Sequence, residues 1–134
     1  MRIITICITS SLFLLLTSCK KTVCGFGDVI VGKWHLIEEL MDPGDGSGTF
    51  QPVSSNKEIR FFNNGTFEAN GEMCGMANQA SSTHTGTYDT STETFSPDNC
   101  MSTAPISYKY SVNGNTLILI YPCTCGCQQK YERL

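Results

Sequence analysis

The sequence predicts an all-β domain, and three observations support that prediction. Downstream of Cys19, no helical period of useful length occurs. Short runs rich in Ile, Phe, Tyr, Val and Thr alternate apolar with polar residues, which is typical of half-buried strands. Asn64-Gly65 and Asn113-Gly114 separate such runs, and Asn-Gly is a strong signal for a two-residue hairpin turn. The chain of 134 residues has room for one domain.

The alternating runs define eight expected strands: Lys33–Met41, Lys57–Asn63, Thr66–Asn70, Gly86–Asp89, Glu93–Phe95, Ser107–Val112, Thr116–Tyr121 and Gln128–Arg133. Sequential antiparallel strands favour an up-and-down barrel, because closure removes exposed strand edges. In such a barrel the long connections lie at one end and the tight turns at the other. The long ones are 42–56, 71–85, 96–106 and 122–127. We expect function at the long-loop end, since loops carry function more often than strands.

The N-terminal segment predicts export. Met1–Arg2 and the apolar stretch Ile3–Leu16 fit a secretory signal, and the stretch is too short for a membrane span of ~20 residues. Leu16-Thr17-Ser18-Cys19 resembles the lipobox of bacterial lipoproteins, which implies cleavage before Cys19 and acylation of that residue. The alternative is an ordinary signal peptide with an incidental cysteine. We expect a signal peptide over 1–18, an anchored linker over 19–30 and a barrel over 31–134.

Charge and composition restrict the partners. Charged residues make up 16% of the chain and the formal net charge is −3, which argues against disorder. No basic run is available to neutralise phosphates, so we expect no nucleic-acid partner. An acidic surface leaves membrane attachment to the acyl chains on Cys19. By resemblance to other lipoproteins, Lys20-Lys21 without a neighbouring Asp implies the outer membrane, with the leaflet left open.

An ordered series of motifs resembles the small lipocalin-like lipoproteins of Bacteroidetes. The series is Gly32-Lys33-Trp34, the glycine-rich segment 42–48, Ile59 with Asn64-Gly65-Thr66-Phe67, and the cysteines before Lys130-Tyr131. The resemblance covers nearly all of the chain after the signal and implies a barrel with a possible ligand cavity. The chain departs from lipocalins in being short and in lacking a clear helix after the barrel.

Barrel closure also predicts a pair of neighbours at the tight-turn end. The last strand of an eight-stranded barrel runs antiparallel to the first, which brings Arg133 next to Trp34. This arrangement resembles that of lipocalins, in which an arginine side chain from a late strand lies across the tryptophan ring in a cation–π contact. We expect this pair to close the barrel and to carry no chemistry.

The two-residue period places Leu36, Glu38 and Leu40 on the same face as Trp34, toward the interior. The side chains that we expect to line a ligand cavity are Leu36, Glu38, Leu40, Phe61, Tyr88, Tyr108, Tyr110 and Tyr121. Tyrosines combine apolar bodies with polar tips, which suits a small amphipathic ligand. Their bulk also allows an interior that side chains fill completely.

The cysteines are first interpreted as disulfide candidates, because an exported domain with an even number of cysteines favours bridges. The candidates are Cys24, Cys74, Cys100, Cys123, Cys125 and Cys127. We expect Cys74 and Cys100 to pair with two cysteines of the 123–127 group. The partner of Cys24 is left open, although the ten residues to Trp34 could span about 33 Å and bring Cys24 to the remaining cysteine. The alternative is a soft-metal site for Cu(I) or Zn, built from the 123–127 thiolates with Met73 and Met76.

Signs of catalysis are scarce. His35 and His84 are the only histidines, and no nucleophile elbow accompanies them. The segment 42–48 lacks the acidic spacing of a calcium loop and is expected to be a glycine-rich turn. We therefore expect no enzyme, no cofactor and no metal. The leading hypothesis is binding of a small amphipathic molecule at the open barrel end, and the alternative is a packed barrel whose loops bind another envelope protein.

Overall fold

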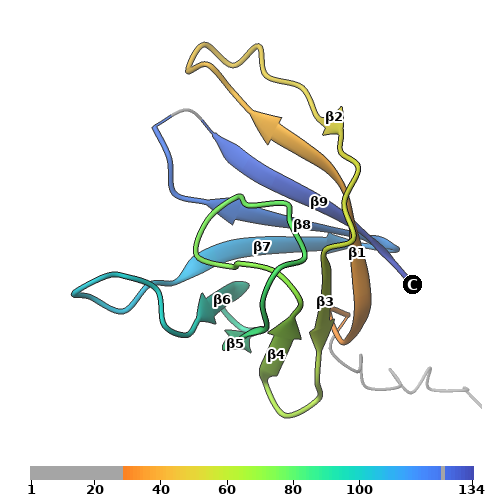
Figure 1. The fold of residues 1–134 in the computed structure, drawn as a ribbon, viewed down its shortest axis with the longest axis vertical. Coiled ribbons are helices and arrows are strands. Elements are labelled where there is room, and N and C mark those ends of the chain that lie inside the picture. The colour runs from red at the N-terminus through yellow and green to blue at the C-terminus, as the bar shows by residue number, and fades with distance from the viewer. Residues whose placement is uncertain (1–28, 125) are drawn as a thin grey trace, which may run out of the picture.

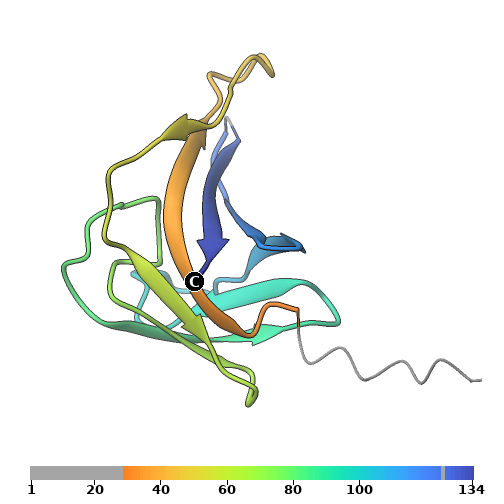
Figure 2. The ribbon, with the colours of Figure 1, turned by 90° about the vertical axis from the view of Figure 1, so that its right-hand side faces the viewer.

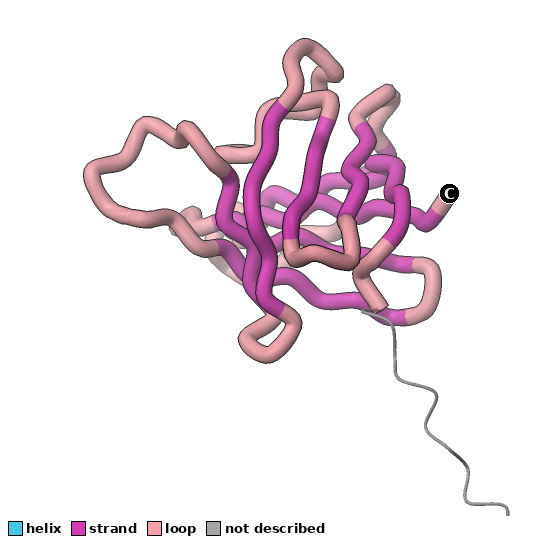
Figure 3. Tube along the Cα trace, turned by 90° about the horizontal axis from the view of Figure 1, so that it is seen from below, coloured by secondary structure: helices cyan, strands magenta, loops and turns pink. Residues whose placement is uncertain are grey.

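The computed structural model describes residues 29–124 and 126–134 and shows a closed eight-stranded antiparallel β-barrel (Figure 1). The strands, in chain order, are β1 (Gly32–Met41), β2 (Gln51–Pro52), β3 (Glu58–Phe61), β4 (Thr66–Ala69), β5 (His84–Asp89), β6 (Thr94–Pro97), β7 (Tyr108–Asn113), β8 (Thr116–Tyr121) and β9 (Cys127–Arg133). Strands and loops make up the whole of the described chain, as the view from below shows (Figure 3). No described helix has the length and hydropathy required to cross a membrane.

Closure comes from pairing between the first and last strands. β1 pairs with β9 from Trp34↔Arg133 to Met41↔Cys127, and the two strands lie side by side in Figure 2. Between them the strands follow chain order, each antiparallel to the next. β2 and β3 share the other edge of β1, where β3 pairs with its first half and β2 with its second. The barrel therefore has eight strand positions, and β2 follows β3 along the same edge of β1.

The predicted strands are all present, and their ends shift by a few residues. The short run predicted at Glu93–Phe95 is β6, Thr94–Pro97. The predicted Asn-Gly turns are confirmed: Gly65 and Gly114 have φ of +79° and +58°, which glycine adopts without steric cost. β2 was not predicted, because two residues that include a proline carry no alternating pattern.

The core fills the interior of the barrel with large apolar side chains. It consists of Ile30, Trp34, Leu36, Ile59, Phe61, Phe67, Ala69, Met73, Tyr88, Phe95, Tyr108, Tyr110, Leu117, Leu119, Tyr121 and Tyr131. Ring contacts link Phe61 to Phe67, Phe67 to Phe95, and Phe95 to Tyr108, with centroids 5.2–6.1 Å apart. Such aromatic pairs add to the free energy gained from burial alone. Ile30 belongs to this core, so the folded unit includes the last residue of the segment that we expected to be linker.

A β-bulge in β1 overturns part of the predicted interior. The register with β9 shifts between Leu36 and Glu38, which leaves Ile37 as the extra residue. Beyond the bulge, Glu38 pairs with Lys130 and Glu39 pairs with the buried Gln129. The prediction that Glu38 and Leu40 face inward is therefore wrong, because one inserted residue exchanges the two faces of the strand.

The closed end of the barrel is organised around Trp34. Its indole N–H donates to the Ile30 carbonyl at 2.7 Å, and the Arg133 guanidinium carbon lies 4.1 Å from the ring centroid. Arg133 also donates to the Val31 and Val29 carbonyls. Gly32 has φ of +137°, a backbone conformation that favours glycine, and a Cβ at this position would also lie 2.6 Å from Arg133 Nη1. The pair predicted from strand order thus lies where the first and last strands meet.

Candidate functional site

The open end of the barrel is covered by the segment between β4 and β5, which we call the β4–β5 loop (residues 70–83), the green loop in Figure 1. Met73 of this loop is fully buried and belongs to the core, and Met76 packs against that core. The loop is therefore packed into the barrel end. The space beneath it is occupied by Met73.

Lys57, just before β3, holds the loop from below. Its side chain is completely buried, and its ammonium donates to the main-chain carbonyls of Glu72 at 2.6 Å and Ala77 at 2.7 Å. A third, longer bond of 3.3 Å reaches Gln129 Oε1. The three donors of the ammonium are thus all used, which is the condition for burying a charge at tolerable cost.

Gln129 of β9 is the second buried polar group and joins the loop to the barrel wall. Its Oε1 accepts from Tyr131 at 2.8 Å and from Tyr121 at 3.2 Å, besides the bond from Lys57. Its Nε2 donates to Glu39 Oε1 at 2.7 Å and to the Ala77 carbonyl at 3.4 Å. Both ends of the amide are satisfied, so the network is complete and its orientation is fixed.

Burial controls the protonation of this network. It lowers the pKa of Lys57 from its usual 10.5 to about 8, against the opposing negative charges of Glu72 and Glu39. Burial also raises the pKa of Tyr121 and of Tyr131, so both phenols remain hydrogen-bond donors. Around Lys57 the described charged groups are thus Glu39 from β1 and Glu72 from the loop.

An aromatic wall lies beside the network. Tyr108, Tyr121 and Phe95 contact one another, with ring centroids 5.2–5.9 Å apart. The Tyr108 hydroxyl donates to the Cys74 carbonyl of the β4–β5 loop at 2.8 Å. Lys57, Gln129 and Tyr108 therefore all direct donors at main-chain oxygens of one loop.

The predicted cavity residues are divided between the two ends. Tyr108 and Tyr121 lie at the covered open end, beside the network. Tyr88, Tyr110 and Phe61 lie toward the closed end, where the hydroxyls of the tyrosines donate to the Phe62 and Asp89 carbonyls. Leu36 is buried in β1, two residues from Trp34. The predicted residues that face inward do not form a single site.

Two residues that sequence reasoning missed are the polar centre of the site. Lys57 shares a face with Ile59 and Phe61, and Gln129 shares one with Tyr131. A polar residue in phase with buried apolar residues was the available signal. Phe95, also missed as an inward residue, lies in the short strand whose pattern was weakest.

The cysteines pair differently from the prediction. Cys74 is bonded to Cys100, and Cys123 to Cys127. The predicted bridges from Cys74 and Cys100 to the 123–127 group are wrong, because the β4–β5 loop and the 98–107 loop are neighbours at this end. Cys24 and Cys125 lie outside the described residues, as do Cys19 and the signal segment 1–18.

The cysteines that the structure describes at the open end are disulfide-bonded, and Asp42 of the glycine-rich segment is hydrogen-bonded within its own turn. Cys123 and Cys127 of the soft-metal alternative are bonded to each other, and disulfide sulfur is not the thiolate that such metals select. Asp42 in the glycine-rich segment accepts bonds from the backbone N–H groups of Gly44, Gly46 and Gly48. Within residues 29–124 and 126–134, no group of three or more His, Cys, Asp or Glu is placed to hold a metal.

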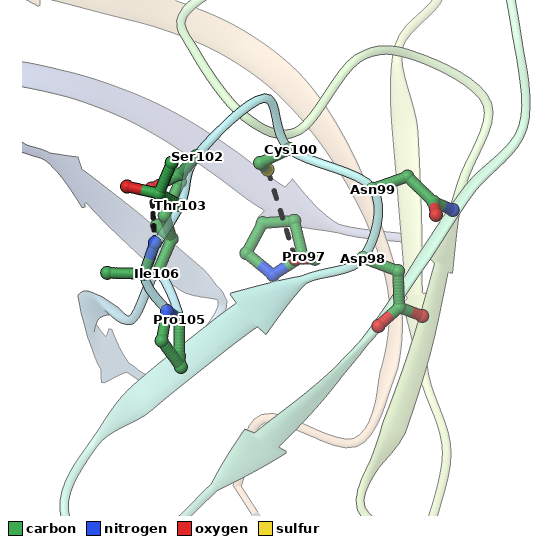
Figure 4. A pocket seen from close by; sticks show the side chains of 9 residues that line it. Pro97, Asp98, Asn99, Cys100, Ser102, Thr103, Pro105 and Ile106 are labelled. Atoms are coloured by element: carbon green, nitrogen blue, oxygen red, sulfur yellow. Dashed lines mark hydrogen bonds between the residues drawn. The ribbon is translucent and has the colours of Figure 1, made fainter.

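Shallow surface depressions flank the covered end. One of about 320 Å³ lies between the end of β6 and the 98–107 loop, lined by Pro97, Pro105 and Ile106 among others (Figure 4). A second, of about 390 Å³, adjoins the Cys74–Cys100 bridge and is lined in part by Glu72 and His84. β6 and β7 share two register pairs, against five between β7 and β8, so the barrel wall is least paired here.

The fold and the covered end define a closed antiparallel barrel with a buried polar network under one loop. Comparisons of the chain with protein-family models, with curated proteins and with solved structures give no match. The resemblance to lipocalin-like lipoproteins therefore stays a prediction from the sequence.

Proposed function

We propose that this protein is a non-catalytic, lipid-anchored envelope protein that binds a small amphipathic molecule at the open end of its barrel. One observation carries the proposal: the β4–β5 loop places acceptor oxygens on Lys57, Gln129 and Tyr108, and an apolar side chain, Met73, in the core. An amphipathic ligand combines the same features, with acceptor oxygens and an apolar body. The loop thus occupies a site whose chemistry suits such a ligand.

The test uses residues 20–134, exported to an oxidising periplasm and purified without reductant. Native mass spectrometry reveals any co-purified organic mass, and 8-anilinonaphthalene-1-sulfonate serves as a probe because it joins an aromatic body to sulfonate oxygens. We expect Tyr108→Phe to weaken probe binding about tenfold, as loss of one hydrogen bond to a charged group does. Tyr110→Phe is the matched control, since it removes a hydroxyl at the closed end. Equal effects of the two substitutions would refute the proposed site.

The anchor is tested separately. The full chain, labelled with a fatty-acid analogue, should carry the label and fractionate with the outer membrane, and Cys19→Ser should lose both properties. Retention of the label in the Cys19→Ser variant would refute acylation at this position. This result does not depend on what the barrel binds.

A second candidate function is a protein-interaction module. Its support is the filled interior, together with Met101, which is fully exposed in the 98–107 loop beside a disulfide. Methionine is enriched in protein–protein interfaces relative to the rest of the protein surface. We expect Met101→Asp to abolish cross-linking to a neighbouring envelope protein in this case, without changing binding of the anilinonaphthalene probe.

A further inference from the structure

We propose that the β4–β5 loop is a lid, that Met73 is the plug it carries, and that the Lys57 side chain is the latch that keeps it shut. The proposal deepens the proposed function, on which it rests for the identity of what enters the opened barrel. The opening itself requires no ligand and is tested without one.

The loop is attached to the barrel through polar contacts that can be exchanged for water. Lys57 binds the Glu72 and Ala77 carbonyls, Tyr108 binds the Cys74 carbonyl, and Ser55 Oγ donates to the Asn78 carbonyl. None of the described loop residues before His84 belongs to a strand. Segments with few ladder hydrogen bonds open at lower free energy than the sheet they cover.

Lys57 is the central contact because it bridges the two halves of the lid. Glu72 precedes Met73 and Ala77 follows it, so one ammonium fixes the chain on both sides of the plug. Loss of the Lys57 side chain removes the donor to the Glu72 carbonyl and leaves the Ala77 carbonyl only the longer bond from Gln129 Nε2, which favours exposure of both carbonyls to water. Opening then moves Met73 out of the core and uncovers Tyr108 and Tyr121.

Gly71 supplies an independent way to disturb the same contact. A Cβ at this position would lie 2.5 Å from the Gln79 carbonyl oxygen and 3.1–3.2 Å from the Lys57 side chain. At Gly75, in the same loop, an added Cβ would approach nothing closer than Glu72 Oε2 at 3.5 Å, an ordinary contact. Gly71→Ala therefore wedges the lid, and Gly75→Ala is its matched control.

The Cys74–Cys100 bridge determines how the lid opens. It ties the residue after the plug to the 98–107 loop, so the lid remains attached there while the latch is released. The movement is a local displacement of the loop and leaves the barrel strands paired. A readout specific for Met73 therefore distinguishes opening of the lid from unfolding of the protein.

Methionine oxidation provides that readout. Hydrogen peroxide transfers one oxygen atom to the thioether sulfur, giving the sulfoxide and water, and the reaction requires access to the sulfur. Met73 is fully buried, whereas Met101 is fully exposed and reports the intrinsic rate in the same molecule. Peptide mass spectrometry of the oxidised wild-type protein yields the ratio of the Met73 rate to the Met101 rate.

We expect Lys57→Leu and Gly71→Ala each to raise this ratio by about tenfold or more, the factor that loss of one buried hydrogen bond produces. Gly75→Ala should leave it unchanged. Lys109→Leu should do the same, because it removes a lysine–carbonyl bond, to Thr92, at the closed end. Hydrogen exchange in the wild-type protein should show amides 72–78 opening before those of β8.

Two results would refute the proposal that the β4–β5 loop is a lid. One is exchange of 72–78 together with β8 in the wild type, which needs no variant to fold. The other is an unchanged Met73 ratio in folded Lys57→Leu and Gly71→Ala. If the ratio rises and the anilinonaphthalene sulfonate still does not bind, the lid stands and the proposed ligand-binding function fails.

Discussion

The two ends of the barrel are stabilised by different physics. At the closed end, Trp34 is buried among apolar side chains and covered by Arg133, whose bonds go to carbonyls of the entering chain. At the open end, a buried ammonium and amide hold a loop that has no strand partners of its own. The apolar packing around Trp34 is lost only when the whole domain unfolds. The polar contacts of the β4–β5 loop can break while the barrel stays folded. One small barrel thus combines a rigid base with a releasable cover.

The largest expected loss of stability comes from a substitution at the closed end. Trp34→Ala removes a fully buried indole and its bond to Ile30, so the free energy of unfolding should fall by about 3–5 kcal/mol. Urea titration followed by tyrosine fluorescence measures it. Ile120→Ala, a change at a partly exposed residue of β8, should cost less than about 1 kcal/mol. Similar losses in both variants would contradict the special place of Trp34.

The next largest loss of stability is expected from removal of the disulfides at the open end. Cys74–Cys100 spans 26 residues and Cys123–Cys127 spans 4, so the chain-entropy estimate assigns them about 3.5 and about 2 kcal/mol. We expect the Cys74→Ala/Cys100→Ala variant to lose more stability in urea than Cys123→Ala/Cys127→Ala. The reverse order would show that the bridge on the β4–β5 loop contributes little to the barrel.

The smallest effect is the pH dependence of the lid. The pKa of Lys57 is lowered in the closed state, so the closed state binds the proton less tightly than an open state with a hydrated amine. Protonation therefore favours opening. Between pH 7 and 9 closure should strengthen by about 1.4 kcal/mol, roughly tenfold, and the ratio of Met73 to Met101 oxidation should fall accordingly.

The same measurement on Lys57→Leu is the control, because the ratio should then be independent of pH in this range. The direction is informative in itself. A ratio that rises with pH in the wild type would mean that losing one of the three ammonium donors that hold the lid weakens closure by more than removal of the buried charge strengthens it.

The strands could be predicted from the sequence because their signals are local. Alternation and two Asn-Gly turns identify β3, β4, β7 and β8. Strand order then places Arg133 beside Trp34, which depends on chain connectivity alone.

The covered site could not be predicted, for two physical reasons. The bulge at Ile37 has no signature in the alternation, yet it exchanges Glu38 for Glu39 on the inner face. The β4–β5 loop has no period from which its path over the barrel could follow. The disulfide partners depend on that path, so the pairing of Cys74 with Cys100 could not be predicted either.

Besides covering Trp34, Arg133 holds the first described residues of the chain at the closed end. Its guanidinium donates to Val29 and Val31, and the Leu134 N–H donates to Lys33, so both termini of the described chain leave from the closed end. With an acyl group on Cys19, the ten residues to Val29 give a tether of at most about 33 Å. An anchor on Cys19 would then attach to the barrel at its closed end, the end opposite the β4–β5 loop. A molecule that enters beneath the lid would reach the barrel at the end farther from such an anchor.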